Sequence, residues 1–327
     1  MRADSLLADK FMKFPLFALC LALGIAAGHA APVWQPQPGH QQIPLWPKTP
    51  PDSAKNQAPE TVEGADSKVA GRPFTVIRNV SRPTMTVYSP KAGNTGVAVV
   101  VFPGGGYQVL AIDLEGTEVC DWLTSRGITC IVLKYRVPDS GPHREDSCKC
   151  QVTPNAPLAL EDAERALGLV RLHAREWHID PHKIGVLGFS AGGHLVAAMS
   201  THFGKRAYPP VDAADKESCR PDFAVALYPG HLWMHDEKKF ALNPDIHVTA
   251  RTPPTFLLQA ENDNVDNVNQ ALVYYIALKD AHVPAEMHLY AEGGHGFGLR
   301  RTRQPITEWP DLVEKWLGTI GIIPARN

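Results

Sequence analysis

The sequence predicts an α/β protein with one mostly parallel sheet of about eight strands and helices on both of its faces. Apolar runs of strand length alternate with amphipathic helical stretches from Phe74 to the C-terminus, which is typical of a parallel sheet covered by helices. The central runs lack the apolar and polar alternation of a half-exposed strand, as strands buried on both faces do. The chain has 327 residues, a length that suits one large domain.

The first 30 residues are predicted to be a secretory signal peptide. Lys10 and Lys13 precede an apolar run from Phe14 to Ala27, and Gly28-His29-Ala30 offers small residues for cleavage. This run is shorter than the roughly 20 residues that a membrane-spanning helix needs. We therefore expect export to the periplasm or the medium without membrane integration, with Met12 as an alternative translation start.

Residues 31–72 are predicted to form a proline-rich arm ahead of the main domain, residues 73–327. Eight prolines lie between Pro32 and Pro59, and proline removes backbone donors and favours extended segments. Trp34 and Trp46 favour an arm that docks on the domain. A disordered tether is the alternative.

Strands and helices are expected to alternate along the main domain. The strands are expected at 74–80, 84–88, 97–102, 129–133, 184–187, 224–228, 255–259 and 286–290. The helices are expected at 115–126, 157–176, 191–201, 268–281 and 309–317. Two polar, proline-rich insertions, 138–157 and 203–221, interrupt this alternation at strand or helix ends, where binding surfaces are commonly built.

The charge balance argues against nucleic acid as a partner. The chain carries 32 basic and 34 acidic side chains, a formal net charge of −2, with no basic cluster. The electrostatic footprint of a nucleic-acid binder is therefore missing. We expect a neutral small molecule or polymer as ligand, and the oligomeric state is left open.

Five cysteines follow the predicted signal peptide, so at least one thiol is expected to stay free. Cys120 and Cys130 lie in apolar runs, where buried thiols are common. We expect a disulfide between Cys219 and either Cys148 or Cys150, because an exported chain permits one. A metal site is the less favoured alternative, since Cys-x-Cys lacks the spacing of common zinc loops.

The most informative motif is Gly-x-Ser-x-Gly at residues 188–192, centred on Ser190. The apolar run 183–187 before it predicts a strand, and 194–199 after it predicts a helix. This context is typical of a nucleophile elbow, a strained turn that lifts a serine hydroxyl out of the backbone. A glycine turn with an idle serine is the alternative, and it is weakened by the partner residues found further along the chain.

A serine hydroxyl must give its proton to a base as it attacks, and His295 is the expected base. It lies in the glycine-rich loop 293–297, directly after the last expected strand. His194 lies four residues beyond Ser190 on the same helix face. Its side chain is expected to point into the packed layer, so we assign it a structural role.

The acid that orients the histidine is expected between the serine and the histidine, after the next-to-last strand. The loop 259–266 offers three carboxylates there. We predict Asp263, because a hydrophobic residue follows it two positions later. Asp266 is the second choice, and Glu261 is the third and is expected to orient the loop.

Acyl transfer also needs donors aimed at an oxyanion, each worth about 2.7–4 kcal/mol of barrier. The backbone amides of Gly105, Gly106 and Ala191 are the predicted donors, because glycine lets the backbone approach a ligand closely. Tyr107, which follows these glycines, is expected to contact substrate. A phosphate-binding loop is improbable, since no Gly-Lys-Ser/Thr follows.

Together these motifs resemble the α/β-hydrolase superfamily, and within it the bacterial carbohydrate-esterase branch of acetyl xylan esterases, feruloyl esterases and xylanase B-like proteins. The resemblance covers roughly Phe74 to the C-terminus. It rests on Pro103–Gly106, Leu133–Pro138, Gly188–His194, Asp263, Leu272–Tyr275 and Gly294–Gly296. The branch commonly has Asp-Asp-Pro where this chain has Asn262-Asp263-Asn264, and an apparent extra residue before Val268 keeps Asp266 open as the acid.

The resemblance implies an α/β-hydrolase fold and a serine esterase that removes acetyl or feruloyl groups from carbohydrates such as xylan, with acetyl favoured. It implies no metal and no organic cofactor, and neither a nucleic acid nor a membrane as partner. The alternatives are a lipase or short-chain carboxylesterase, an exopeptidase of the prolyl-oligopeptidase type, and an inactive relative that binds carbohydrate or acts in adhesion.

Overall fold

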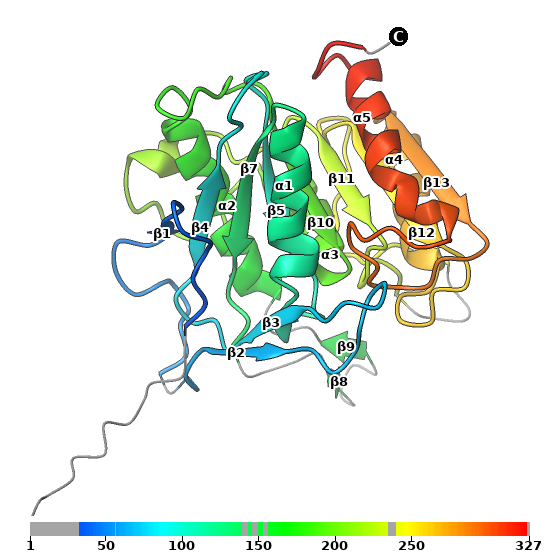
Figure 1. The fold of residues 1–327 in the computed structure, drawn as a ribbon, viewed down its shortest axis with the longest axis horizontal. Coiled ribbons are helices and arrows are strands. Elements are labelled where there is room, and N and C mark those ends of the chain that lie inside the picture. The colour runs from blue at the N-terminus through cyan, green and yellow to red at the C-terminus, as the bar shows by residue number, and fades with distance from the viewer. Residues whose placement is uncertain are drawn as a thin grey trace, which may run out of the picture. The chain divides into compact units, whose positions relative to one another are not determined.

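The main sheet of the computed structural model contains eight strands (Figure 1). In spatial order they are β1 (Gln42–Pro44), β4 (Thr84–Tyr88), β7 (Thr129–Lys134), β5 (Ala98–Phe102), β10 (Ile184–Phe189), β11 (Ala224–Leu227), β12 (Thr255–Ala260) and β13 (Ala285–Tyr290). Neighbours from β7 to β13 are parallel, whereas β4 runs antiparallel to β7 and β1 antiparallel to β4. The predicted α/β class with a mostly parallel sheet is confirmed.

The structure describes residues 33–55, 57–138, 143–145, 150–152, 156–234 and 240–325. The predicted signal peptide, residues 1–30, and Cys148 lie outside the described residues. The chain from Ala31 onward forms one unit. Within the described part of the chain, no helix combines the length and apolarity that a bilayer crossing requires.

The core of this unit is built on the central strands. Strands β5, β7, β10, β11 and β12 are buried along their whole length, as their unbroken apolar runs predict for strands covered on both faces. The edge strand β13 is mostly half-buried. Burial is therefore deepest at the middle of the sheet, where β10 leads to Ser190.

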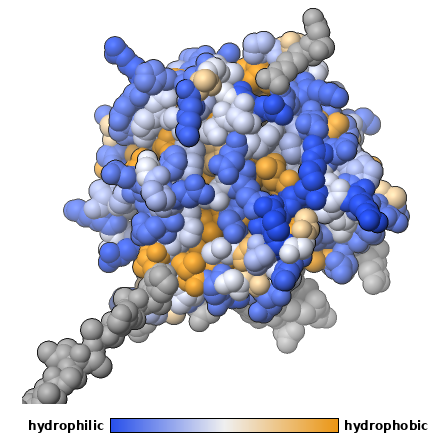
Figure 2. Space-filling view, viewed as in Figure 1, coloured by the Kyte–Doolittle hydropathy of each residue, from blue (hydrophilic) through white to orange (hydrophobic). Residues whose placement is uncertain are grey.

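In the described part of the chain, five α-helices cover the sheet. They are α1 (Glu118–Ser125), α2 (Ala156–Leu172), α3 (Ala191–His202), α4 (Asn269–Asp280) and α5 (Trp309–Thr319). Figure 1 shows α1 and α5 in front of the sheet and α2 and α3 behind it. The front face is mainly hydrophilic, with hydrophobic side chains scattered over it (Figure 2), because amphipathic helices turn their polar side to solvent. Short helical segments lie at Asp113–Thr117, which is π-helical and leads into α1, and at Ala213–Lys216 and Pro305–Glu308.

Two smaller sheets accompany the main one. A three-stranded sheet contains β2 (Thr61–Gly64), β3 (Thr75–Arg78) and β6 (Val109–Leu110), and a hairpin contains β8 (His143–Glu145) and β9 (Cys150–Val152). The expectation that residues 74–80 join the main sheet is wrong. Asn79 adopts a left-handed conformation, φ 56°, directly after β3, and so turns the chain away before β4 begins. The eighth place in the main sheet belongs to β1.

The arm packs on the domain. Its strand β1 pairs with β4, and the ring nitrogen of buried Trp46 donates a 2.8 Å hydrogen bond to Oδ1 of Asp162 in α2. The carbonyl of Leu45 accepts a 2.9 Å hydrogen bond from Nε of Arg165. Buried polar groups are thereby satisfied from both sides of the contact, which ties residues 42–46 to α2.

The cysteine pairing differs from the expectation. Cys120 in α1 and Cys130 in β7 form a disulfide with a Cα–Cα distance of 5.1 Å, although they were expected to be buried thiols. Cys219 is a free, buried thiol, so the expected bridge from it to Cys148 or Cys150 is wrong. The sequence could not reveal this, because the pairing follows from how α1 packs on β7. Burial raises the pKa of the Cys219 thiol to about 11.

Candidate active site

Ser190 lies at the sharp turn between β10 and α3. Its backbone has φ 53° and ψ −119°, a combination that L residues adopt rarely and at a cost of about 1–3 kcal/mol. The turn is possible because α3 begins close against β5: a Cβ atom on Gly192 would lie 2.1 Å from the carbonyl oxygen of Phe102. This geometry leaves the Ser190 side chain at the carboxyl end of the sheet, where the neighbouring loops can reach it.

His295 lies in the loop after β13 and contacts the serine. Its Nε2 is 2.9 Å from Oγ of Ser190, and its Nδ1 is 2.7 Å from Oδ2 of Asp263. With Asp263 accepting the proton on Nδ1, Nε2 is left as an acceptor for the serine hydroxyl. The structure therefore brings together the three side chains that the sequence motifs singled out.

The carboxylate of Asp263 is fixed by its own loop. Its Oδ1 accepts the N–H groups of Val265 and Asp266 at 2.9 Å each. Its Oδ2 accepts Nε2 of Gln259 at 3.0 Å in addition to His295. The side chain is fully buried. Of the three carboxylates in this loop, Asp263 is the one that contacts Nδ1 of His295, so it occupies the position expected of the orienting acid.

The charges around His295 favour its protonated form. Burial alone would lower the pKa of His295, but the hydrogen bond and charge of Asp263, followed by the charges of Asp266 and Glu115, outweigh it. The net result is a pKa above the ordinary imidazole value. An imidazolium formed when His295 takes a proton is therefore stabilised by its surroundings.

The glycine loop after β5 lies beside the serine. Gly105 has φ 134°, and a Cβ atom there would lie 2.2 Å from the carbonyl oxygen of Val109, so no other residue fits. Gly105 and Gly106 line the same pocket as Ser190. Among the described residues, no acceptor is bound to the amides of Gly105, Gly106 and Ala191. These three donors remain available to a ligand.

A buried acid that sequence reasoning missed supports this loop. Glu115 accepts the N–H of Gly104 at 2.8 Å through Oε2 and the hydroxyl of Tyr228 at 2.8 Å through Oε1. The Tyr228 oxygen in turn accepts the N–H of Gly298 at 3.0 Å, and its ring lies edge-on to His295. Through Tyr228, Glu115 thus connects the glycine loop to the loop after β13 that carries His295, the histidine loop. Its sequence signal, an acid near a helix start, is common to many surface residues.

The charge state of Glu115 reflects competing effects. Burial raises its pKa, and this effect exceeds the lowering by Tyr228, His295 and Gly104. The carboxylate is 3% exposed. The N–H of Gly104 and the hydroxyl of Tyr228 each donate a hydrogen bond to one oxygen of Glu115. These two hydrogen bonds fix the orientation of the carboxylate behind the glycine loop.

Ser190 and His295 open into a pocket of about 670 Å³. One wall comes from the small sheet, through Val76 and Arg78 of β3 and Val109 of β6. Because these residues line the pocket with Ser190, the small sheet lies over the carboxyl ends of the main strands, below the main sheet in Figure 1. Ligands of open α/β sheets commonly bind at this edge.

A second wall comes from the segment after β11. His231 and Trp233 line the pocket, and Oε1 of Gln270 accepts the N–H groups of Leu232 and Trp233 at 2.6 Å each. The segment is therefore pinned to α4 and keeps its shape. Burial lowers the pKa of His231, and the neighbouring Asp266 opposes that effect.

Comparison with known proteins identifies the fold family. The solved structure of an acetyl ester-xyloside bifunctional hydrolase from Caldicellulosiruptor lactoaceticus is 34% identical, with a TM-score of 0.65, over 86% of this chain and 97% of that one. The chain belongs to the α/β-hydrolase superfamily. Two family models match this chain: BD-FAE over residues 85–227 and the prolyl oligopeptidase family over residues 164–319.

Two curated relatives of this chain have names related to xylan. An acetylxylan esterase of Xylanibacter ruminicola is 29% identical over 63% of this chain, and an endo-1,4-beta-xylanase B of Butyrivibrio fibrisolvens is 29% identical over 61% of it. The chain spans 42% and 32% of the lengths of these two relatives. Each relative therefore extends well beyond the segment that it shares with this chain.

The expectation that Tyr107 contacts substrate is wrong. Tyr107 has a left-handed backbone, φ 57°, and its side chain is fully buried. Its hydroxyl forms a 2.7 Å hydrogen bond with Nδ1 of His194. The left-handed turn directs the ring into the core, so that Tyr107 supports the glycine loop from inside and leaves the pocket lining to Gly105 and Gly106.

His194 lies in the packed layer, as expected. It is 7% exposed, and burial, with smaller contributions from His231 and His202, lowers its pKa to about 3. A histidine that stays neutral and bonds to Tyr107 cannot reach the pocket as a second base. Its position on the helix below Ser190 therefore serves packing.

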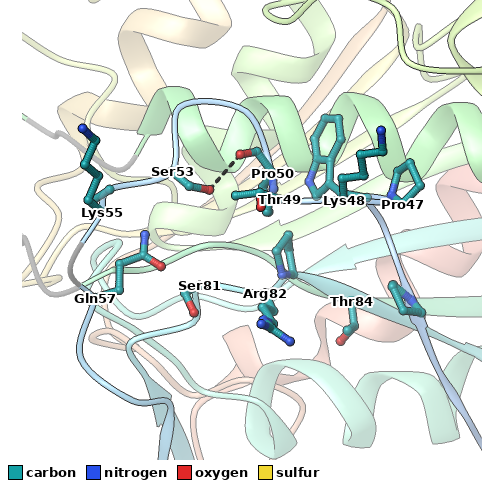
Figure 3. A pocket seen from close by; sticks show the side chains of 14 residues that line it. Pro47, Lys48, Thr49, Pro50, Ser53, Lys55, Gln57, Ser81, Arg82 and Thr84 are labelled. Carbon is teal, nitrogen blue, oxygen red and sulfur yellow. Dashed lines mark hydrogen bonds between the residues drawn. The ribbon is translucent and has the colours of Figure 1, made fainter.

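A second hollow, of about 710 Å³, lies between arm residues 44–55 and 57 on one side and residues 81–84 on the other (Figure 3). Its lining shares no residue with the pocket of Ser190. Lys48, Lys55 and Arg82 surround it, and Figure 3 shows their side chains pointing in different directions. This hollow lacks the convergent groups that a reaction needs, so the chemistry is assigned to the pocket of Ser190.

Proposed function

We propose that the protein is a serine esterase that hydrolyses acyl esters of carbohydrates, acetyl esters above all. The observation that carries this proposal is the hydrogen-bonded series from Ser190 through His295 to Asp263, with distances of 2.9 and 2.7 Å. Nucleophile, base and orienting acid are the set that acyl transfer by serine requires. Gly105 and Gly106 support the same reaction, because their backbone amides have no acceptor among the described residues.

In the proposed reaction, Oγ of Ser190 attacks the ester carbonyl while Nε2 of His295 takes its proton. Asp263 holds the imidazole in the required tautomer and stabilises the imidazolium. The negative charge on the former carbonyl oxygen is held by the free amides of Gly105, Gly106 and Ala191. The imidazolium then gives its proton to the leaving alcohol, which departs and leaves an acyl group on Ser190.

The second half of the reaction repeats these roles with water. His295 takes a proton from a water molecule, which attacks the acyl carbonyl, and the proton returns to Oγ of Ser190 as the acid leaves. The substrate assignment is supported by the names of the relatives, an acetylxylan esterase and an acetyl ester-xyloside hydrolase.

We also propose export, on the basic residues and apolar run ahead of Ala30. N-terminal sequencing of exported protein should begin near Ala31, and an intact leader would contradict it.

A peptidase is the second candidate, because the prolyl oligopeptidase family model matches residues 164–319. The same nucleophile and base serve amide hydrolysis, in which the leaving group is an amine. The two candidates differ in their substrates, so one assay can separate them.

The test is a product screen on acetylated xylan, feruloylated arabinoxylan, a short aryl acetate and an aminoacyl arylamide. We expect release of acetate and no cleavage of the arylamide. Ser190→Ala should lose the ester activity by roughly 10⁴-fold or more. Ser200→Ala, a matched change in α3 outside the pocket, should retain it. Arylamide cleavage without acetate release would favour the peptidase, and full activity of Ser190→Ala would remove the proposed mechanism.

A further inference from the structure

Asp266 is an acidic side chain of the pocket whose charge helps to raise the pKa of His295, but the proposed mechanism gives it no contact with the substrate. It lines the pocket together with Ser190 and His295, and its side chain is 14% exposed. Its Oδ2 lies 3.3 Å from Oγ of Ser190 and 3.7 Å from Nε2 of His295. This carboxylate therefore borders the atoms that exchange the proton.

The structure holds Asp266 firmly in this place. Its N–H donates to Oδ1 of Asp263 at 2.9 Å, and its carbonyl accepts Nε2 of Gln259 at 2.8 Å. A Cβ atom on Gly230 would lie 2.6 Å from both carboxylate oxygens, so the loop after β11 fits against the side chain only because residue 230 is glycine. A ligand would meet the carboxylate in a fixed position.

Asp266 is less suited than His295 to take the serine proton. Nε2 of His295 is 2.9 Å from Oγ of Ser190, against 3.3 Å for Oδ2 of Asp266. Burial raises the pKa of Asp266, and the charges of His295 and His231 oppose that effect. The geometry therefore leaves the carboxylate as an acceptor for a group that comes with the substrate.

The position beside His295 tells which part of the substrate Asp266 would meet. Nε2 of His295 must deliver its proton to the leaving alcohol oxygen, so that oxygen binds near Nε2. Asp266 lies 3.7 Å from the same nitrogen, and hence beside the alcohol. An acetyl group has no hydrogen-bond donor, whereas an alcohol with further hydroxyl groups does. Trp233 lines the same pocket and offers an aromatic surface for the C–H face of a sugar ring.

We propose that Asp266 selects the alcohol part of the ester by accepting a hydrogen bond from a hydroxyl group adjacent to the ester oxygen. The inference rests on the proposed esterase function and narrows its substrates to esters of polyols and sugars that keep a neighbouring hydroxyl free. Esters of simple alcohols have no donor for Asp266 and leave its carboxylate without that partner.

The test compares two acetates with the same acyl group and the same three-carbon alcohol skeleton, glycerol 1-acetate and propyl acetate. The wild-type protein should favour glycerol acetate in kcat/KM by roughly ten- to hundredfold, the usual worth of a hydrogen bond to a charged group. Asp266→Ala should bring this ratio close to one. Asp266→Asn keeps one acceptor oxygen and should give an intermediate ratio.

The ratio of kcat/KM for the two acetates distinguishes recognition of the alcohol by Asp266 from a general structural role. A structural loss would lower kcat/KM for both acetates equally and leave the ratio unchanged. Glu261→Gln removes a carboxylate from the same loop at an exposed position and should keep the wild-type ratio. A wild-type ratio near one, or an unchanged ratio in both Asp266 variants, would overturn the inference while leaving the esterase in place. If the wild-type protein hydrolysed none of the three esters, glycerol 1-acetate, propyl acetate and an aryl acetate, the proposed function would be overturned, and this inference with it.

Discussion

The backbone strain at Ser190 is tolerated because the elements on both sides fix the turn. The N–H of Ser190 donates to the carbonyl of Leu227 at 3.1 Å, and its carbonyl accepts the N–H groups of His194 and Gly230. Positive φ values outside glycine persist where the surroundings determine them. At this residue the strained backbone carries a hydroxyl that lies 2.9 Å from Nε2 of His295. For this reason Ser190 is the serine proposed as nucleophile.

The raised pKa of His295 predicts the pH dependence of the reaction. In the proposed reaction the neutral imidazole accepts the proton of Ser190, so kcat/KM should fall as the pH drops through the pKa of His295. Because that pKa lies above the ordinary imidazole value, this fall on the acid side of the profile, the acid limb, should lie at a higher pH than an unperturbed histidine would give. Glu115→Gln removes a negative charge that favours the imidazolium, so it should move the acid limb to lower pH.

The same variant should also lower activity, by roughly ten- to hundredfold in kcat/KM, because it weakens the support of Gly104 by a charged acceptor. Full pH profiles of kcat/KM measure both effects. Glu176→Gln removes a carboxylate that is 68% exposed and serves as the control with an unshifted profile. An acid limb at the same pH in wild type and Glu115→Gln would contradict the assigned electrostatics.

At the residue scale, sequence order and loop placement were enough to single out Ser190, Asp263 and His295. Each follows a strand whose carboxyl end lies at one edge of the sheet, so topology brings them together. Spacing favoured Asp263 but left Asp266 open, because both lie in one loop. The two carboxylates differ in which imidazole nitrogen they approach: Asp263 lies 2.7 Å from Nδ1 of His295 and Asp266 3.7 Å from Nε2. Tyr107 was misassigned because its left-handed backbone leaves no mark in the sequence.

At the element scale, the arm contributes strand β1 to the main sheet, strand β2 to the small sheet and a buried tryptophan to the domain. The ring of Trp46 is 6% exposed, and it lies edge-on to Tyr208 with a centroid distance of 4.7 Å. The guanidinium groups of Arg136 and Arg165 lie 5.9 and 5.7 Å from the ring centroid, within cation–π range. The arm is thus anchored by one large side chain inserted among charged groups.

Trp46→Ala should therefore destabilise the domain by about 3–5 kcal/mol, the usual cost of removing a buried tryptophan. It also deprives the buried carboxylate of Asp162 of a donor. The free energy of unfolding in urea measures the effect. Trp34→Ala, which alters a partly buried ring of the same arm, should cost less. A loss below about 1 kcal/mol for Trp46→Ala would mean that the arm only rests on the domain.

The elements that the sequence failed to predict are short or depend on distant contacts. Strand β1 has three residues within a proline-rich segment, too few for a periodic pattern. The residues of β3 read as a strand, but the sequence could not tell that their partners are β2 and β6. The disulfide likewise joins residues from two elements, Cys120 and Cys130, whose apolar surroundings suit a thiol equally well.

At the scale of the whole molecule, the order of buried strands made the fold class predictable. Each of the central runs lacks polar alternation, and only a sheet covered on both faces accommodates such strands. In the strand order β5-β10-β11-β12-β13, the loop of Gly105 follows β5, Ser190 follows β10, the loop of Asp263 follows β12 and the loop of His295 follows β13, so all four lie at carboxyl ends on one edge of the sheet. The pocket of about 670 Å³ lies over this edge, so the site is a product of the topology as a whole.

The central claim is that Ser190 is a nucleophile activated by His295, and covalent labelling tests it directly. The folded protein is incubated with a fluorophosphonate, and the digested peptides are mapped by mass spectrometry, with fragmentation of the peptide of residues 184–205 to separate Ser190 from Ser200. We expect one adduct on Ser190 that forms far more slowly in His295→Ala. Ester hydrolysis without an adduct on Ser190, or equal labelling rates in both proteins, would contradict it.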